Sequence, residues 1–235
     1  MCLSTDNCKK PLEGGEAALP SDACGMDALK DAAKNGGTVP EFVETVCVEQ
    51  GKALNLKRHN DRMNATRSAF WGGSVPELSL EDWIQPESYE KCTRCRVVYA
   101  QNVLKVEYFP YQMRNVQSLK LVVCDEADYR YKSTDRSLLN RLFAERGEAD
   151  DVLVVRNGLL TDTTIANIAL FDGEVWYTPA HPLLKGTRRQ TLLEDHLIEE
   201  RDIKAEDIYH YHRIRLFNAM IPFGKIDFET KKAVC

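Results

Sequence analysis

Four short apolar segments between residues 152 and 177 are separated by turn signals, and this arrangement limits the fold most strongly. Asn157-Gly158 and Asp172-Gly173 are dipeptides of the kind that close two-residue β-hairpin turns. The first dipeptide lies between Val152–Val155 and Leu159–Thr161. The second lies between Ile165–Phe171 and Val175–Tyr177. Strands joined by such short turns are antiparallel neighbours. The pattern therefore favours an α+β fold over a doubly wound parallel sheet.

The remaining elements mix strands and helices without a regular βαβ order, which supports the same fold class. Apolar residues recur at helical spacing in Leu56–Trp71, in residues 133–145 and in residues 187–200. A shorter helix is expected after Ser79. Strand patterns occupy residues 42–48, 96–99, 103–109 and 116–124.

Charge and hydrophobicity exclude two classes of protein. The chain has 31 basic and 36 acidic residues, a net charge of −5, whereas a general nucleic-acid binder carries a basic surplus. The sequence has no run of 18 consecutive apolar residues, which excludes a membrane-spanning helix. The first ten residues lack the apolar run of a signal peptide. These features predict a soluble, cytoplasmic protein with no nucleic-acid or membrane partner.

The first 38 residues contain no Ile, Phe, Trp or Tyr, so they are predicted to be a disordered tail. The chain has eight cysteines, and two of them form a CxxC motif, Cys92-Thr93-Arg94-Cys95. The sequence has no second CxxC motif and no pair of histidines at the spacing of zinc ligands. We therefore interpret the cysteines as thiols and expect no metal site.

Five separate segments resemble one family in the same order. These are His59-Asn-Asp-Arg62, Lys132-Ser-Thr-Asp-Arg136, the segment Asn157 to Asn167, the segment Thr178 to Arg189, and Phe217-Asn-Ala-Met-Ile-Pro222. They are similar to the conserved segments of class IV pyridoxal-phosphate enzymes, a family that includes aminodeoxychorismate lyases and branched-chain aminotransferases. The resemblance implies fold type IV, with a small domain at residues 39–112, a large domain at residues 113–235 and a homodimer.

The resemblance also implies which residues hold pyridoxal 5′-phosphate. Lys132 would form the Schiff base, and the neighbouring Arg130 and Arg136 are expected to lower its pKa. Asp162 would face the pyridine nitrogen, in a position where the family usually has the longer Glu. The remaining cofactor-binding residues would be Arg62, Gly186, Thr187 and Arg188 around the phosphate, with Asn218 nearby.

Substrate contacts are implied at two positions on strands. Thr45 would relay a proton, and Arg96 would offer a cation to a substrate carboxylate. The preferred activity is 4-amino-4-deoxychorismate lyase, which releases pyruvate and 4-aminobenzoate on the folate route. A class IV aminotransferase of the branched-chain or D-amino acid type needs the same residues and stays open, as does a family member that binds the cofactor without catalysis.

Overall fold

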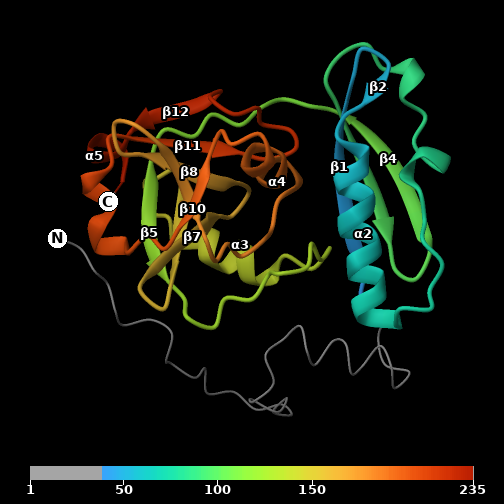
Figure 1. Cartoon of the computed structure of the whole chain (residues 1–235), viewed down its shortest axis with the longest axis horizontal. Helices are drawn as coiled ribbons and strands as arrows, with labels where there is room; N and C mark the ends of the chain where they lie inside the picture. The colour runs from blue at the N-terminus through green and yellow to red at the C-terminus, as the bar shows by residue number, and fades with distance from the viewer. Residues whose placement is uncertain (1–38, 235) are drawn as a thin grey trace.

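A computed structural model describes residues 39–234, so the tail predicted for residues 1–38 lies outside the described residues. The described residues form three β-sheets with short helices between them (Figure 1). This mixture of sheets and helices agrees with the predicted α+β class. Within the same residues, no helix has the length and apolar character needed to cross a membrane.

The first sheet is antiparallel and has the strand order β2-β1-β3-β4. Its strands are β1 (Phe42–Glu49), β2 (Lys52–Ala53), β3 (Thr93–Tyr99) and β4 (Val103–Pro110). Helix α2 (Leu56–Trp71) packs against it, because Met63 and Phe70 share an apolar cluster with Phe42 and Tyr99 of the sheet. The predicted bounds of this helix are confirmed, and the two short turns η1 (Leu80–Asp82) and η2 (Pro86–Ser88) follow it.

The other two sheets come from the second half of the chain. The three-stranded sheet contains β5 (Leu119–Val123), β6 (Asp151–Arg156) and β7 (Leu159–Thr163). The five-stranded sheet has the order β10-β9-β8-β11-β12, with β8 (Asn167–Phe171), β9 (Trp176–Pro179), β10 (Glu199–Arg201), β11 (Arg213–Phe217) and β12 (Ile226–Glu229). The turn signals at Asn157-Gly158 and Asp172-Gly173 do close antiparallel hairpins. One apolar cluster joins both sheets, with Leu153, Ile168 and Leu216 fully buried in it.

The helices of the second half are α3 (Ser137–Ala144), α4 (Thr187–Glu194), the 3-10 helix η3 (Ala205–His210) and α5 (Thr230–Ala233). Two helix predictions were too long. Residues 133–136 are not helical, because Ser133 forms a bridge with Phe42 of β1 and the Thr134 N–H donates to the Glu41 carbonyl. The helix predicted for residues 187–200 is α4, which ends at Glu194. His196 has a left-handed φ of 54°, and residues 199–201 pair with β9 instead. Strands β11 and β12 were not predicted.

The segment that carries Lys132 connects the two halves of the chain. The backbone N–H of Val43 donates to the Lys132 carbonyl at 2.9 Å, and that of Thr134 donates to Glu41 at 2.9 Å. The segment therefore extends the first sheet along β1, although it belongs to the second half by sequence. Lys132 is thus placed where the halves meet. The predicted domain boundary at residues 112–113 and the homodimer stay predictions.

Candidate active site

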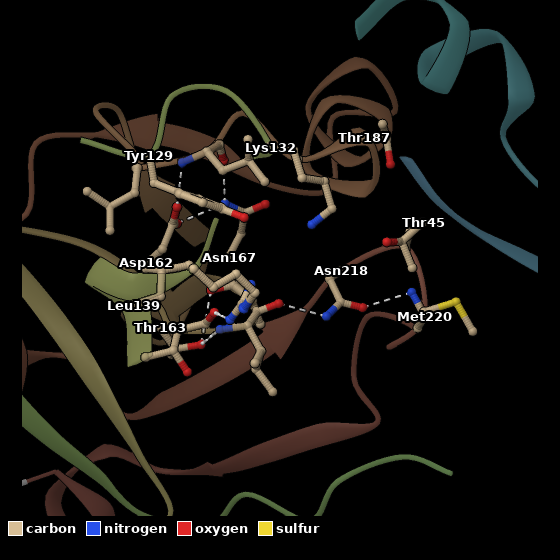
Figure 2. A pocket seen from close by; sticks show the side chains of 18 of the residues that line it. Thr45, Tyr129, Lys132, Leu139, Asp162, Thr163, Asn167, Thr187, Asn218 and Met220 are labelled. Atoms are coloured by element: carbon tan, nitrogen blue, oxygen red, sulfur yellow. Dashed lines mark hydrogen bonds between the residues drawn. The ribbon is translucent and has the colours of Figure 1, made fainter. Parts of the chain in front are cut away.

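One cavity brings together most of the residues predicted for the site (Figure 2). From the first half of the chain it is lined by Thr45 of β1 and Arg62 of α2. The second half contributes the remaining predicted lining residues, which are Lys132, Asp162, Gly186, Thr187 and Asn218. These residues are far apart in the sequence, and the fold places them around one cavity.

Lys132 points its Nζ into this cavity (Figure 2). Within residues 39–234 no hydrogen bond or ion pair holds that amine. Burial lowers the pKa of Lys132 to about 7, and the positive charges of Arg62, Arg136 and Arg96 act in the same direction against Glu44. Burial is thus the largest cause, and Arg130, predicted to contribute, pairs with Asp128 instead. At neutral pH a large fraction of this amine is uncharged and able to act as a nucleophile.

Asp162 forms another wall of the cavity and is only 4% exposed. Its two oxygens accept hydrogen bonds from the Asn167 side-chain amide at 2.8 Å and from the Leu184 backbone N–H at 2.9 Å. Burial raises the pKa of Asp162 to about 6, although these hydrogen bonds oppose the shift. A positive charge brought into the cavity beside it would favour the carboxylate form. The carboxylate is therefore fixed in position. Within residues 39–234 no cationic side chain forms an ion pair with it, although the charge of Arg189 also favours its ionised form.

Gly186 supports this wall by leaving room for Asn167. A Cβ at position 186 would overlap the side-chain oxygen of Asn167, whose amide nitrogen donates both to Asp162 and to the Leu184 carbonyl. Asn167 is buried and held by two bonds, so it cannot move aside freely. In the sequence Asn167 is only the last residue of a motif, and this supporting position was not predicted for it.

We predict that Gly186→Ala disturbs the cavity without unfolding the protein. The new methyl group must displace Asn167 and break at least one of its hydrogen bonds, at a cost of about 1–3 kcal/mol for a buried polar group. The expected result is about 5- to 150-fold weaker binding of pyridoxal phosphate to the apoprotein, measured by fluorescence titration. Gly73→Ala is the matched control, since a Cβ there would meet only the Ser68 hydroxyl, at an ordinary contact distance of 3.8 Å. Equal affinity of Gly186→Ala and the wild type would contradict the prediction.

A network of buried polar groups fixes Arg62, another lining residue of the cavity. The Arg62 guanidinium donates through Nε and Nη2 to the two oxygens of Glu44, at 2.9 and 2.5 Å. Burial alone would raise the pKa of Glu44, but the charge of Arg62 and the hydrogen bonds from His59 and Arg62 lower it to about 2. The carboxylate thus stays charged and orients the guanidinium. Within the described residues Nη1 of Arg62 has no hydrogen-bond partner.

The same network reaches the first residue of α4. The Glu44 carboxylate can only accept, so His59 donates through Nδ1 at 2.6 Å. Burial lowers the pKa of His59, which favours the neutral ring and leaves Nε2 as an acceptor for the Thr187 hydroxyl at 3.3 Å. Sequence reasoning gave no role to Glu44. Its only signal was its place beside Thr45, because its partners His59 and Arg62 lie 15 and 18 positions away.

Two predicted residues, Arg96 and Arg188, do not line this cavity, and a third, Asn218, lines it with its side chain already bonded. Arg96 does not line this cavity but an adjoining one, which Lys132 and Thr45 also line. Arg188 lines neither cavity, and only its backbone belongs to the first turn of α4. Asn218 does line the cavity, but its side chain bonds to the Ile165 carbonyl and to the N–H groups of Met220 and Ile221, so it holds a loop together. Tyr129 and Arg136 line both cavities. Tyr129 was not predicted, and Arg136 was predicted only to lower the pKa of Lys132, which it does.

Comparison with known proteins defines the class. The family described as amino-transferase class IV matches residues 41–227. A protein of Haemophilus influenzae, described as uncharacterized, is 38% identical over 180 residues, which cover 75% of this chain and 96% of that protein. A Schizosaccharomyces pombe protein named "Putative aminodeoxychorismate lyase" is 35% identical over 190 residues, covering 72% and 81%.

A solved structure agrees with these relatives. The crystal structure of a "putative 4-amino-4-deoxychorismate lyase" from Haemophilus somnus 129pt is 34% identical, covers 77% of this chain and 97% of its own, and superposes with a TM-score of 0.71. The chain belongs to the class IV aminotransferase family. Members of this family are enzymes that depend on pyridoxal phosphate.

Proposed function

We propose that the protein is a pyridoxal-phosphate-dependent 4-amino-4-deoxychorismate lyase. The observation that carries the proposal is the amine of Lys132, which has no hydrogen-bond partner in the described part of the chain and shares one cavity with Arg62 and with the Asp162 carboxylate. The relatives at 34% and 35% identity that are named for this lyase support this activity over transamination. The Phe217–Pro222 run, which resembles the closing run of such lyases, supports it too.

The cavity fits pyridoxal phosphate in its charges. The phosphate is an anion, and Nη1 of Arg62 and the N-terminal amides of α4, which begins at Thr187, are donors of the kind that hold one. The Thr187 hydroxyl itself donates to His59. The pyridine nitrogen is a base whose protonated form needs a carboxylate, and Asp162 would supply it. Gly186 also lines the cavity. Its lack of a side chain leaves room for Asn167, which a Cβ at position 186 would overlap.

The chain's own residues would bind the substrate and move its protons. When bound, pyridoxal phosphate supplies an aldehyde that condenses with amines and a ring that withdraws electrons. Lys132 would hold the cofactor and, after the substrate amine replaces it, would remove and return a proton as base and acid. A pKa of about 7 suits both duties. Thr45 lines the same cavity, where its hydroxyl would relay that proton.

One assay separates this proposal from its alternatives. Purified holoenzyme is expected to release pyruvate and 4-aminobenzoate in equal amounts from aminodeoxychorismate, with pyruvate measured by coupling to lactate dehydrogenase. Transfer of amino groups between branched-chain amino acids or D-amino acids and keto acids, without pyruvate release, would establish the aminotransferase instead. A protein that takes up cofactor but performs neither reaction would be the non-catalytic family member.

We predict that Arg62→Lys weakens cofactor binding. Lysine keeps a positive charge beside Glu44 but loses the guanidinium fork that leaves Nη1 free for the phosphate. Loss of a hydrogen bond to a charged group costs about 1.5–3 kcal/mol, so the dissociation constant of pyridoxal phosphate should rise about 10- to 150-fold. Arg58→Lys is the control, because Arg58 lies on the same helix but outside the cavity, where it pairs with Asp61 and with Glu194 at the end of α4. An unchanged constant for Arg62→Lys would remove Arg62 from the phosphate site.

A further inference from the structure

A second cavity adjoins the first and is lined on several sides by positive charge. We call it the outer chamber, and it shares Thr45, Tyr129 and Lys132 with the inner cavity. Its cationic lining residues are Arg94, Arg96, Arg114, Lys132 and Arg136. Among the described residues no Asp or Glu lines it. In a chain with a net charge of −5, such a lining favours an anionic occupant.

Two of these arginines, Arg114 and Arg136, are held by contacts within the protein, and Arg96 is only partly compensated. Arg114 bonds to the Asp150 carbonyl and lies 4.6 Å from the centroid of the Phe143 ring. Arg136 donates to the Thr164 carbonyl at 2.8 Å. Arg96 donates to the Glu107 carboxylate at 3.2 Å, although Lys105 competes for the same carboxylate.

Arg94 is different, and the strand register explains why. Residues 94 and 96 alternate on β3, so their side chains lie on the same face of the sheet. Strand β4 places Glu107 opposite Arg96 but Phe109 opposite Arg94. The Arg94 guanidinium stacks on that ring at 5.2 Å from its centroid, and its Nε is buried without a hydrogen-bond partner in the described part of the chain. Arg94 is therefore held by stacking, and among residues 39–234 no hydrogen bond engages its guanidinium.

We propose that the outer chamber selects substrates with two carboxylates, of which Arg96 binds one and Arg94 binds the other. This inference rests on the proposed function, which places the reacting amine of the substrate beside Lys132. Ile165, Met220 and Ile221 line the same chamber and give an apolar surface for a ring that carries the two carboxylates. A substrate with one carboxylate and a neutral side chain leaves Arg94 as it is in the free protein, so it lacks the charge-assisted hydrogen bonds that a second carboxylate would form there. Arg94 is thus a specificity-determining residue.

The test measures binding to the holoenzyme by isothermal titration calorimetry. The probes are chorismate, which carries both carboxylates of the proposed substrate and a hydroxyl in place of its amine, and 4-hydroxybenzoate, which carries one. Wild type is expected to bind chorismate at least about 10-fold more tightly. Arg94→Gln is expected to weaken chorismate about 10- to 30-fold and 4-hydroxybenzoate less than about 3-fold. Arg141→Gln, an exposed arginine of α3, is the matched control and should change neither.

Several results would overturn the proposal. These are equal affinity of wild type for both probes, an Arg94→Gln effect that is the same on both probes, and an Arg94→Gln variant that binds both as wild type does. The wild-type comparison needs no variant, so it stands even where Arg94→Gln fails to fold. Binding also needs no turnover. A protein that prefers chorismate but releases no pyruvate would refute the lyase alone, whereas pyruvate release without that preference would refute the role of Arg94 alone.

Discussion

Lys132→Ala is expected to lower the rate of pyruvate release from aminodeoxychorismate by at least about four orders of magnitude. The substitution removes both the amine that would hold the cofactor and the group that would move the proton, and general acid–base catalysis alone contributes about 10²- to 10⁴-fold. No other lysine lines the inner cavity in the described structure. The coupled pyruvate assay at saturating substrate measures the loss.

Two controls make the Lys132 result specific. Lys185→Ala removes an exposed lysine next to Gly186 and should keep wild-type activity. Borohydride reduction of the wild-type holoenzyme, followed by mass spectrometry of its peptides, is expected to find the cofactor on Lys132. A cofactor adduct on Lys120, Lys185 or any other lysine would contradict the assignment. Pyruvate release by Lys132→Ala at more than about a hundredth of the wild-type rate would contradict it as well.

Sequence patterns predicted the elements that local signals define. Helix α2 has an apolar stripe from Leu56 and ends before two glycines, so its bounds follow from nearby residues. The last helix was wrong beyond Glu194, because residues 199–201 pair with β9, about 20 residues earlier. Strands β11 and β12 were missed since they are defined by pairing with each other and with β8. Long-range pairing is invisible to a local pattern.

In the candidate site, too, the sequence indicated individual residues but not the long-range contacts between them. The family resemblance supplied the positions of Lys132, Asp162 and Arg62, and the structure places all three on one cavity. The resemblance did not predict which neighbouring residues hold these three side chains in position. Glu44 is a buried carboxylate that holds Arg62 and His59, and its position in a strand pattern carries no sign of either contact. Arg94 likewise differs from Arg96 only through the residue opposite it on β4.

The Asp162→Asn variant tests the electronic role proposed for that carboxylate. The substitution removes the charge and keeps the shape, so it would withdraw the partner that favours a protonated pyridine nitrogen. We expect kcat for pyruvate release to fall by about two orders of magnitude, which corresponds to about 2.7 kcal/mol of transition-state stabilisation. Both Asp162 oxygens accept hydrogen bonds, so the amide of Asn must place its donor toward Asn167 or the Leu184 N–H and disturb one of them.

Asp162→Glu separates that local disturbance from the loss of charge. It restores a carboxylate and is the residue that the family usually has, so it should retain activity within about 10-fold of wild type if charge is the decisive property. Cofactor content is measured for each variant, and kcat is compared only at full occupancy. Wild-type kcat in fully loaded Asp162→Asn would show that the carboxylate does not assist the reaction. An equal loss in Asp162→Asn and Asp162→Glu would assign the effect to the fit with Asn167 and Leu184, because only the first variant lacks the charge.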